Sequence, residues 1–560
     1  MTSLMRATVA VCVVALAPPP LDQATPLSCS PAPIRTQPRT TKRTVSLPCK
    51  RLRTANAPTA SCSRGPTIVP AVRRALLVVL AVLGGLVACA TADAASAGGR
   101  GAPLTAINAN FVGGETAAER VASYRRLHAA GVRVVRIDFN WMSLEPVGPP
   151  LHDYQWGALD REVRTIRRAG LKVLAILAYG HPDYSLAGGE AYWSGQQPVP
   201  PFGVGDPQYY PPDDPDTFAR FAGDVADRYR RDVWGWEVWN EENEGWRFWA
   251  PREDPAAYGR LLCAAHRSLR NSDDDARVAL GGMFFPPFIA TGAVSFLDQV
   301  LTAGGPQIGR CFDAVGYHPY PYPFTSPESV VADRGSVISA ATQLRDVLER
   351  HGLADKPLWN TEVGWPTSPN GNGVTEARQA RFVARLALLS WARDVPVITW
   401  YTWGDYTDPS GLNQEAHFGL FRDDGSAKPS FRALTNIKRL LGGRGWRFAG
   451  DQSRALGLPH GVGGVNRGYA LSFRGPNGRR LLALWYANEQ PPASPNPLGP
   501  VEPGTPAATI SVRVPVTAPV KVTNLLGAQR RPRQRSGQLR LSVGQDPVFV
   551  TWRGRASGSP

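Results

Sequence analysis

The sequence predicts an α/β protein, an eight-stranded (β/α) TIM barrel followed by a small C-terminal antiparallel β-sandwich. From about residue 104 to 440, short β-rich runs alternate with amphipathic helical runs. They make eight units of about 40 residues each, the number and size of the units of such a barrel. Residues 444–554 instead show alternating runs such as TISVRVPV and PVFVTWRG between Gly and Pro turns, a pattern typical of a sandwich.

The β-rich runs are the predicted barrel strands. They are Thr105–Phe111, Val132–Phe139, Lys172–Ala178, Val233–Trp239, Val278–Met283, Ala314–Tyr317, Pro357–Thr361 and Val395–Tyr401. A doubly wound open sheet is the competing architecture. Such a sheet carries a Gly-rich phosphate loop after its first strand, whereas Asn108-Ala109-Asn110 stands there. The barrel is therefore the preferred interpretation.

Amphipathic helices are predicted between the strands. The run Ala117–Ala130 (AAERVASYRRLHAA) is one, and Ala158–Ala169 (ALDREVRTIRRA) is another. In the second helix Leu159, Val163 and Ile166 recur at helical spacing, so they are expected to face inward.

The first 98 residues predict export. Residues 1–71 are rich in Pro, Thr, Ser and Arg without apolar periodicity, so a disordered leader is expected there. Arg73-Arg74 and the 16-residue apolar run 75–90 then indicate a signal peptide over residues 72–98, since the run is short for a spanning helix. We expect the true translation start near Val72. The rival start is Met1, with the weaker run Thr8–Ala17.

The segment Leu86–Cys89 also resembles a bacterial lipobox, which would tether the protein to a membrane through a lipidated Cys89. The alternative is ordinary cleavage after Ala92 or Ala94. Both routes predict a protein that is extracellular or associated with the cell envelope.

The net charge of +16 suggests nucleic-acid binding, but its distribution argues against that class. Residues 1–100 hold 12 Lys and Arg against Asp22 and Asp93, which leaves about +6 for residues 101–560. Because the basic residues there are interspersed with acids, no nucleic-acid partner is expected.

Two of the seven cysteines, Cys263 and Cys311, lie in the part of the chain that is expected to fold. Export would permit a disulfide between them. Two buried free thiols are the alternative, since sequence alone does not place their Cα atoms within bridging range.

Two strand-like runs end in a glutamate surrounded by tryptophan. Trp236–Glu244 (WEVWNEENE) carries Glu241, and Pro357–Pro366 (PLWNTEVGWP) carries Glu362, 121 residues later. That spacing corresponds to three βα units, which places the pair at the ends of strands four and seven. Glycoside hydrolysis needs two carboxyl groups flanking the scissile bond, and Trp offers a flat apolar face to a sugar ring. The pair is therefore the candidate for acid/base and nucleophilic chemistry.

Further polar and aromatic residues follow other strands, and barrel sites lie at this end of the strands. The candidates for substrate binding are Arg136, His181, Asn240, His318, Tyr320, Trp365 and Trp403. One geometric condition applies. Neighbours on a regular strand face opposite sides, so Asn240 and Glu241 both reach the site only if the strand breaks there. Glu237, Glu242 and Glu244 are the rival carboxylates.

The Asn-Glu after the fourth strand, Thr-Glu-Val-Gly-Trp-Pro at the seventh and His-Pro-Tyr at the sixth resemble motifs of the retaining glycoside hydrolases of clan A. Families 5 and 39 are the most similar, over roughly residues 104–440. One departure is Glu242, where these families usually have Pro. The resemblance implies that Glu241 is the acid/base and Glu362 the nucleophile, and that Asn240 binds the sugar 2-hydroxyl. It implies that Arg136 and Tyr320 orient Glu362. His318 and His181 would then be the histidines of the rim, and Trp403 the aromatic platform.

The resulting expectation is an exported retaining β-glycosidase that hydrolyses a polysaccharide or oligosaccharide by double displacement. The alternatives are a transglycosylase with the same covalent intermediate and a non-catalytic carbohydrate-binding protein. Four domains are expected: leader 1–71, signal peptide 72–98, catalytic barrel 99–443 and sandwich 444–560. No cofactor is expected. No metal site is expected either, because the histidines show no ligand spacing. The protein is expected to be a monomer.

Overall fold

The computed structural model describes residues 101–554, except 110–115, 199–204, 246, 286–291, 322–323, 330–336, 370–372, 409–412, 462–465, 490–508, 517, 531 and 533. The predicted leader, signal peptide and Cys89 therefore lie outside the described residues. Within them, no helix combines the length and the apolar character that crossing a membrane requires.

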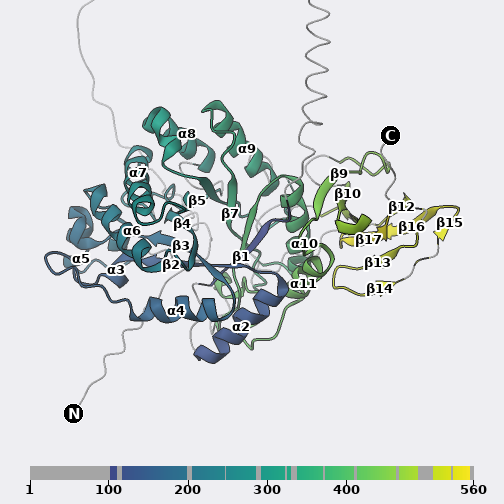
Figure 1. Ribbon diagram of the computed structural model, residues 1–560, viewed down its shortest axis with the longest axis horizontal. Coiled ribbons are helices and arrows are strands. Elements are labelled where there is room, and N and C mark those ends of the chain that lie inside the picture. The colour runs from purple at the N-terminus through teal and green to yellow at the C-terminus, as the bar shows by residue number, and fades with distance from the viewer. Residues whose placement is uncertain are drawn as a thin grey trace, which may run out of the picture. The chain divides into compact units, whose positions relative to one another are not determined.

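Eight parallel strands close into a barrel in chain order, as predicted (Figure 1). They are β1 (Leu104–Asn108), β2 (Val134–Asn140), β3 (Lys172–Ala178), β4 (Val233–Asn240), β5 (Val278–Phe284), β6 (Ala314–His318), β7 (Leu358–Val363) and β8 (Val397–Trp400). Each predicted strand overlaps an observed one. Because all eight run the same way, the residues that follow them share one rim. Asn108, the last residue of β1, pairs with Arg136, which lies inside β2.

Helices cover the outside of the barrel. They are α2 (Ala117–Ala130), α3 (Trp141–Leu144), α4 (Gly157–Arg168), α5 (Leu186–Trp193), α6 (Pro215–Tyr229), α7 (Pro255–Ser272), α8 (Ala293–Gly304), α9 (Val337–Arg350), α10 (Glu376–Ala392) and α11 (Pro429–Leu441). Short 3-10 turns are η1 (Pro182–Tyr184), η2 (Pro207–Tyr209), η3 (Gly305–Arg310), η4 (Gln414–His417) and η6 (Pro476–Gly478). Local chemistry fixes their ends: α2 begins with a capping box in which Thr116 and Glu119 exchange hydrogen bonds. Leu159, Val163 and Ile166 of α4 are buried, as their spacing predicts.

A disulfide joins Cys263 of α7 to Cys311, which follows η3. Of the two alternatives left open by the sequence, the structure has the bridge. It connects the segments that enter β5 and β6, so it holds the outside of the barrel behind the strand that carries His318.

The C-terminal part consists of two antiparallel sheets and no α-helix among its described residues. The six-stranded sheet has the order β14-β13-β17-β11-β10-β9, and the three-stranded sheet the order β12-β16-β15. Their strands are β9 (Arg447–Asp451), β10 (Arg467–Arg474), β11 (Arg479–Ala487), β12 (Ile510–Pro515), β13 (Lys521–Thr523), β14 (Gln529–Arg530), β15 (Gln534–Arg535), β16 (Gln538–Val543) and β17 (Val548–Arg553). Apolar side chains of both sheets share one core, which confirms the predicted sandwich.

The larger sheet is fixed to the barrel by a buried ionic cluster. Arg385 of α10 is fully buried, and its Nη1 lies 3.0 Å from Glu328 and 2.8 Å from Glu489. Trp485 of β11 donates from Nε1 to the same Glu328 at 3.0 Å. Arg381, one turn earlier, reaches Glu489 at 2.7 Å. Buried charged side chains are tolerated only when each is paired. The contact between α10 and the larger sheet therefore has one preferred geometry.

Candidate active site

Glu241 and Glu362 meet at the rim of the barrel, as the sequence predicts. Both are almost fully buried, with 6% and 8% of their surface exposed. His318, the last residue of β6, lies between them, with Nδ1 2.8 Å from Glu241 Oε1 and 3.1 Å from Glu362 Oε2. One oxygen of each carboxyl group and a His318 nitrogen all lie within 4.8 Å of one another.

The backbone of β4 breaks where the prediction required it. Trp239 and Glu241 both adopt positive φ angles, 72° and 51°. Asn240 still pairs with Gly282 of β5, and the Glu241 N–H donates to the Gly282 carbonyl. The left-handed residues turn both side chains toward the site, so the alternation of a regular strand no longer separates them. Gly282 is required here, because a Cβ on it would overlap His318 Nε2.

Arg136 is the cationic centre beneath the pair. Its Nε donates to Glu237 Oε2 at 2.7 Å and its Nη2 to Asn240 Oδ1 at 2.8 Å, while Nη1 lies 3.7 Å from Glu362 Oε2. Glu237, one of the rival carboxylates, is thus the buried counter-ion of Arg136, and it also accepts from the Thr361 hydroxyl at 2.8 Å. This network fixes Asn240 and places positive charge against Glu362.

The tautomer of His318 follows from its neighbours. Arg136 Nη2 lies 3.4 Å from His318 Nε2, and a guanidinium can only donate, so Nε2 accepts. The ring proton therefore sits on Nδ1 and faces Glu241 and Glu362. Burial lowers the pKa of His318 to about 4, which keeps the ring neutral.

The two carboxyl groups share a buried environment that opposes their ionisation. Burial raises the pKa of Glu241 to about 7, and it also raises the pKa of Glu362. Two buried carboxylates this close do not ionise together easily. Asn108 Nδ2 donates to Glu362 at 3.3 Å and Arg136 lies 3.7 Å from the same group, whereas His318 faces both carboxyl groups. These contacts favour the negative charge on Glu362 and the proton on Glu241.

Tyr320 lies close to this pair. Burial raises the pKa of its hydroxyl well above the usual range, and the Glu362 carboxylate adds to the effect. Its ring stands edge-on to that of Tyr401 at 6.3 Å between centroids. Tyr320 therefore interacts electrostatically with Glu362, and its role in orienting that carboxylate stays a prediction.

His181 departs from its predicted role in substrate binding. It is 2% exposed, its Nε2 lies 2.7 Å from the Glu145 carbonyl, and its Nδ1 accepts from the Asp183 N–H at 3.0 Å. A carbonyl only accepts, so the ring proton is on Nε2 and both nitrogens are used by the backbone. Neither is left for a sugar hydroxyl, so His181 holds two loops together.

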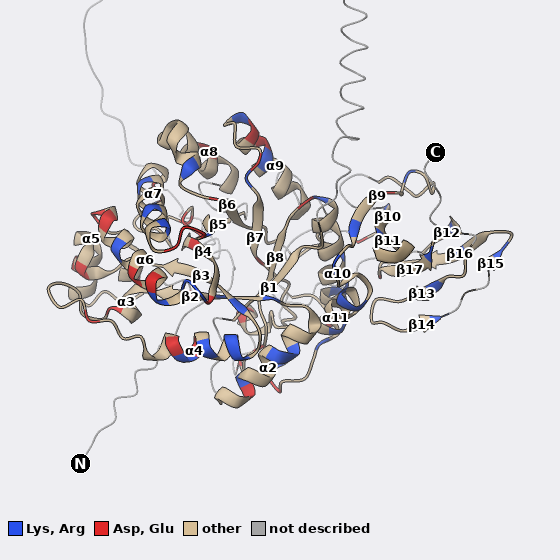
Figure 2. Cartoon of the chain, viewed as in Figure 1, with Lys and Arg blue, Asp and Glu red and all other residues tan. Residues whose placement is uncertain are grey.

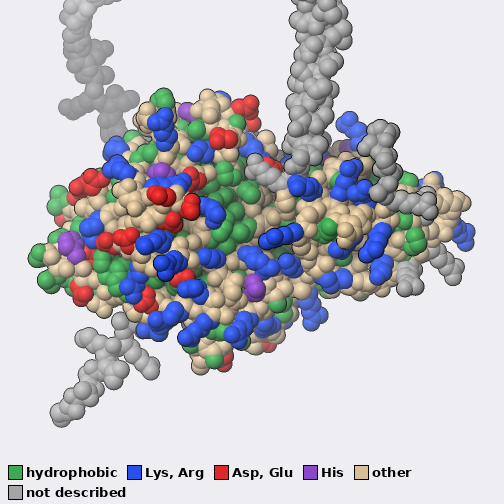
Figure 3. Space-filling model, viewed as in Figure 1, with side chains coloured by type: hydrophobic (Ala, Val, Ile, Leu, Met, Phe, Trp, Pro, Cys, Tyr) green, Lys and Arg blue, Asp and Glu red, His purple; other side chains and the backbone are tan. Residues whose placement is uncertain are grey.

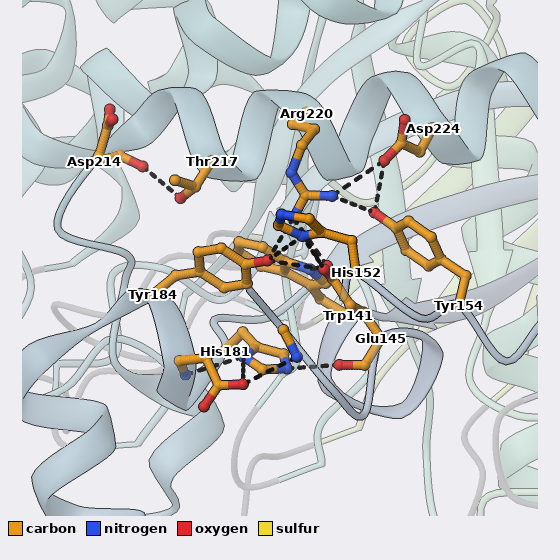
Figure 4. A network of polar contacts seen from close by, with 12 residues as sticks. Trp141, Glu145, His152, Tyr154, His181, Tyr184, Asp214, Thr217, Arg220 and Asp224 are labelled. Carbon is orange, nitrogen blue, oxygen red and sulfur yellow. Dashed lines mark hydrogen bonds and ion pairs between the residues drawn. The ribbon is translucent and has the colours of Figure 1, made fainter. Parts of the chain in front are cut away.

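The residue that organises these loops is Glu145 (Figure 4). Its carboxylate accepts from Trp141 Nε1 at 2.6 Å, from the Tyr184 hydroxyl at 2.8 Å and from Arg220 at 3.0 Å. These donors come from the segments after β2 and β3 and from α6. They lower the pKa of Glu145 although burial opposes this. The network fixes the segments after β2 and β3 to each other and to α6.

The two predicted tryptophans also point elsewhere. Trp365 is 1% exposed, and its Nε1 donates to the Thr325 carbonyl at 2.8 Å. Trp403 packs against Tyr124 of α2 at 5.7 Å, outside the barrel. The aromatic side chain that interacts with Glu362 after β8 is Tyr401, two residues earlier. The contact of Trp403 with Tyr124 does not support its predicted role as a platform.

Three further charged residues lie at the site: Glu244, which is one of the rival carboxylates, and Arg247 and Glu415, which were not selected from the sequence. All are buried, and each interacts electrostatically with Glu241. Burial raises the pKa of Glu415 to about 8 and that of Glu244 well above its usual range. Arg247 lies 3.8 Å from Glu244. Both oxygens of Glu244 and Nε of Arg247 lack a hydrogen-bond partner among the described residues, so polar groups remain beside the carboxyl pair.

Glu241, His318 and Glu362 also form a set whose ligand atoms could reach one metal ion. Their separation along the chain hides this set from any spacing rule. The contacts described above use all three side chains as a hydrogen-bonded triad, with the His318 proton directed to the carboxylates.

No family model matches the chain, and no curated protein matches it. Solved structures do. A family 39 glycoside hydrolase from Bacteroides cellulosilyticus WH2 is 22% identical, with 81% of each chain covered and a TM-score of 0.59. A monomeric β-xylosidase from Caulobacter crescentus CB15 is 16% identical over 82% of this chain and 98% of that one, with a TM-score of 0.55.

A family 30 subfamily 8 xylanase from Clostridium acetobutylicum is 12% identical, over 82% of this chain and 98% of that one, with a TM-score of 0.50. At these identities the likeness shows a shared fold. It confirms the resemblance to family 39 at the level of fold and extends it across the C-terminal sheets, because more than four fifths of the chain is covered.

Proposed function

We propose that the protein is a retaining β-glycosidase. The observation that carries the proposal is the buried pair Glu241 and Glu362, with oxygens within 4.8 Å of each other and the negative charge favoured on one member. Retaining enzymes hold the two carboxyl groups about 5–5.5 Å apart, whereas inverting ones leave about 6.5–9.5 Å for a water molecule. The short separation supports retention.

The contacts assign the roles. Glu362, charged and held by Arg136, His318 and Asn108, attacks the anomeric carbon as Glu241 gives its proton to the departing oxygen. The glycosidic bond breaks and an ester to Glu362 forms. Glu241, now a carboxylate, then takes a proton from water, whose oxygen attacks the anomeric carbon and releases Glu362. Asn240 is held by Arg136 at the edge of the pair, in position for the sugar 2-hydroxyl.

The similar structures suggest where to begin a substrate search. One is named as a β-xylosidase and another as a xylanase, so aryl β-xylosides head a panel that also contains the common aryl β-hexosides. Turnover of any member by the full chain supports the proposal. Binding of sugars without turnover of any member would favour the non-catalytic alternative, and transfer products at high sugar concentration would favour the transglycosylase.

Two variants test the assignment of roles. Glu362→Ala is expected to lose activity by a factor on the order of 10⁶, as for loss of the nucleophile in other covalent enzymes. Azide is expected to restore part of this activity by forming a glycosyl azide of inverted configuration. Glu241→Ala is expected to slow natural glycosides far more than aryl glycosides with good leaving groups, which need little protonation. Equal losses on both substrates would transfer the acid role to Glu244.

Export to the cell envelope or the medium is part of the proposal. The apolar run at residues 75–90 and the Cys263–Cys311 disulfide support it, because disulfides persist in oxidising compartments. Lipidation of Cys89 stays one form of this proposal, and mass spectrometry of the mature N-terminus separates it from simple cleavage. We also propose a monomer, as one similar structure is named; light scattering tests it.

A further inference from the structure

The charge of the folded chain is divided unevenly between its two parts. Residues 101–443 contain 34 Lys and Arg against 40 Asp and Glu, whereas residues 444–560 contain 16 against 4. The barrel is therefore acidic and the C-terminal part strongly basic. Figure 2 shows basic residues on most of its strands. On the face drawn in Figure 3, acidic side chains lie over the barrel and are sparse over the C-terminal sheets.

The few acids of the C-terminal part do little to neutralise its arginines. Glu489 and Asp546 form ion pairs with Arg381 of α10, so they are used by the barrel. Asp451 accepts from Ser453 in a local turn. The remaining acid, residue 502, lies outside the described part of the chain. Among the described residues, the acids of the C-terminal part are therefore far fewer than its Lys and Arg residues.

Three arginines stand in a row across the larger sheet. Arg474 of β10 pairs with Arg447 of β9 on one side and with Arg480 of β11 on the other. Arg480 in turn pairs with Trp552 of β17. Residues directly opposite each other share a face, and like charges in that position are destabilising. Arg447 and Arg474 are exposed, and Arg480 and Trp552 are half-buried, so the row is accessible.

The smaller sheet repeats the arrangement. Arg513 of β12 lies directly opposite Arg540 of β16, and both are exposed between buried apolar neighbours. A fold gains nothing from placing like charges opposite each other twice. An anion that bridges them removes the repulsion.

We propose that the C-terminal sheets bind an anionic polysaccharide, with its acidic groups along the arginine row. Neighbouring strands are about 4.8 Å apart, close to the length of one pyranose unit, so successive acidic sugars meet successive arginines. Arginine binds carboxylate and phosphate in forked pairs. The choice of a polysaccharide over another polyanion rests on the proposed glycosidase activity of the same chain.

The binding test uses the full chain carrying Glu362→Ala, so that no polymer is cleaved during the measurement. The probe is polygalacturonate, and its fully methyl-esterified form is the matched neutral polymer. Binding is expected for the acidic form only. Arg474→Gln with Arg480→Gln is expected to weaken it about tenfold, which corresponds to about 1.4 kcal/mol. The control variant, Arg161→Gln with Arg168→Gln, removes the same charge from exposed positions on α4 and is expected to bind within about twofold of the parent.

Three outcomes would overturn the proposal. They are equal binding of the esterified polymer, equal loss in the α4 control, and tighter binding per charge of single-stranded DNA or of phosphatidylserine vesicles. The two proposals fail separately. Binding without turnover of any glycoside by the wild-type chain removes the glycosidase alone. Turnover without polygalacturonate binding removes the docking surface alone.

Discussion

The two parts of the molecule treat charge in opposite ways. At the candidate site in the barrel the charged groups are buried and joined to one another: Arg136 and Glu237 have 1% and 0% of their side-chain surface exposed and lie 2.7 Å apart. In the C-terminal sheets the arginines face solvent and stand beside other arginines. Buried charges are costly unless they are paired, and their geometry is correspondingly fixed. The charged side chains of the site thus have the fixed geometry that bond cleavage requires. The arginines of the sheets are exposed, as binding of a charged polymer requires.

The largest effect should come from the buried charge between the two parts. Arg385→Met leaves Glu328 and Glu489 as buried acids without their main partner. We expect a loss of about 3–5 kcal/mol in the free energy of unfolding, measured by urea denaturation. Arg393→Met, at the C-terminal end of the same helix, is the control and should change it by less than about 0.5 kcal/mol. Equal effects would mean that burial of the charge does not matter.

Arg136→Met should lower kcat, whereas removal of an arginine from the sheets should not. The variant removes the cation that fixes Asn240 and favours the charge on Glu362. Loss of one such preorganised donor costs a factor on the order of 10²–10³ in kcat. Arg474→Gln removes a cation from the sheets and should leave kcat on a small aryl glycoside unchanged. A comparable loss of kcat in both variants would contradict the assignment of catalysis to the barrel and polymer binding to the sheets.

A pH profile should sharpen the contrast further. Glu241 must carry its proton to act as the acid, and burial raises its pKa to about 7. We therefore expect kcat/KM to fall above pH 7, by about tenfold per unit. Glu241→Gln, assayed on an activated aryl glycoside, should lose this limb. Polygalacturonate binding should stay constant from pH 6 to 8, because arginine remains charged throughout. A shared pH profile would link the two sites.

The smallest expected effect is that of salt concentration, which should change polymer affinity but not kcat/KM. Screening shortens the range of exposed charges from about 10 Å at 0.1 M to about 3 Å at 1 M salt. Polymer binding should therefore weaken steadily with salt, while kcat/KM on a small neutral glycoside stays constant within about twofold. Isothermal titration and initial rates at matched ionic strength measure the two quantities. A salt-independent polymer affinity would point to a neutral contact.

Much of the barrel could be predicted because its strands are short apolar runs separated by helical periodicity. Both carboxylates followed from their positions at strand ends. Arg136 was correctly assigned to the second strand, but it lies inside β2 and not at its end. The residues that were missed lie beyond the strand ends. Arg247 comes after β4 and Glu415 lies in η4, where no period tells which side chains turn inward. Trp403 was chosen as an aromatic residue after β8, but it is Tyr401 that interacts with Glu362.

The prediction for His181 failed for a different reason. Its position after β3 was right, but its hydrogen-bond partners are backbone groups that no side-chain pattern encodes. The prediction that basic and acidic residues are interspersed failed because the net charge was summed over both folded parts. An excess of about +6 over residues 101–560 combines an acidic barrel with a basic sandwich, so the basic residues seemed interspersed with acids when they were segregated by domain.

The position of Glu328 has a consequence for modularity. It lies between β6 and α9, yet its partners are Arg385 of the barrel and Trp485 of the sandwich. A gene fusion that cut the chain at residue 443 and moved the C-terminal sheets to another enzyme would leave Glu328 and Arg385 exposed on the old host. It would also carry Trp485 and Glu489 to a host without matching groups. The two parts are therefore expected to be inherited together. Recombination between them would need to exchange Glu328 and Arg385 together with Trp485 and Glu489.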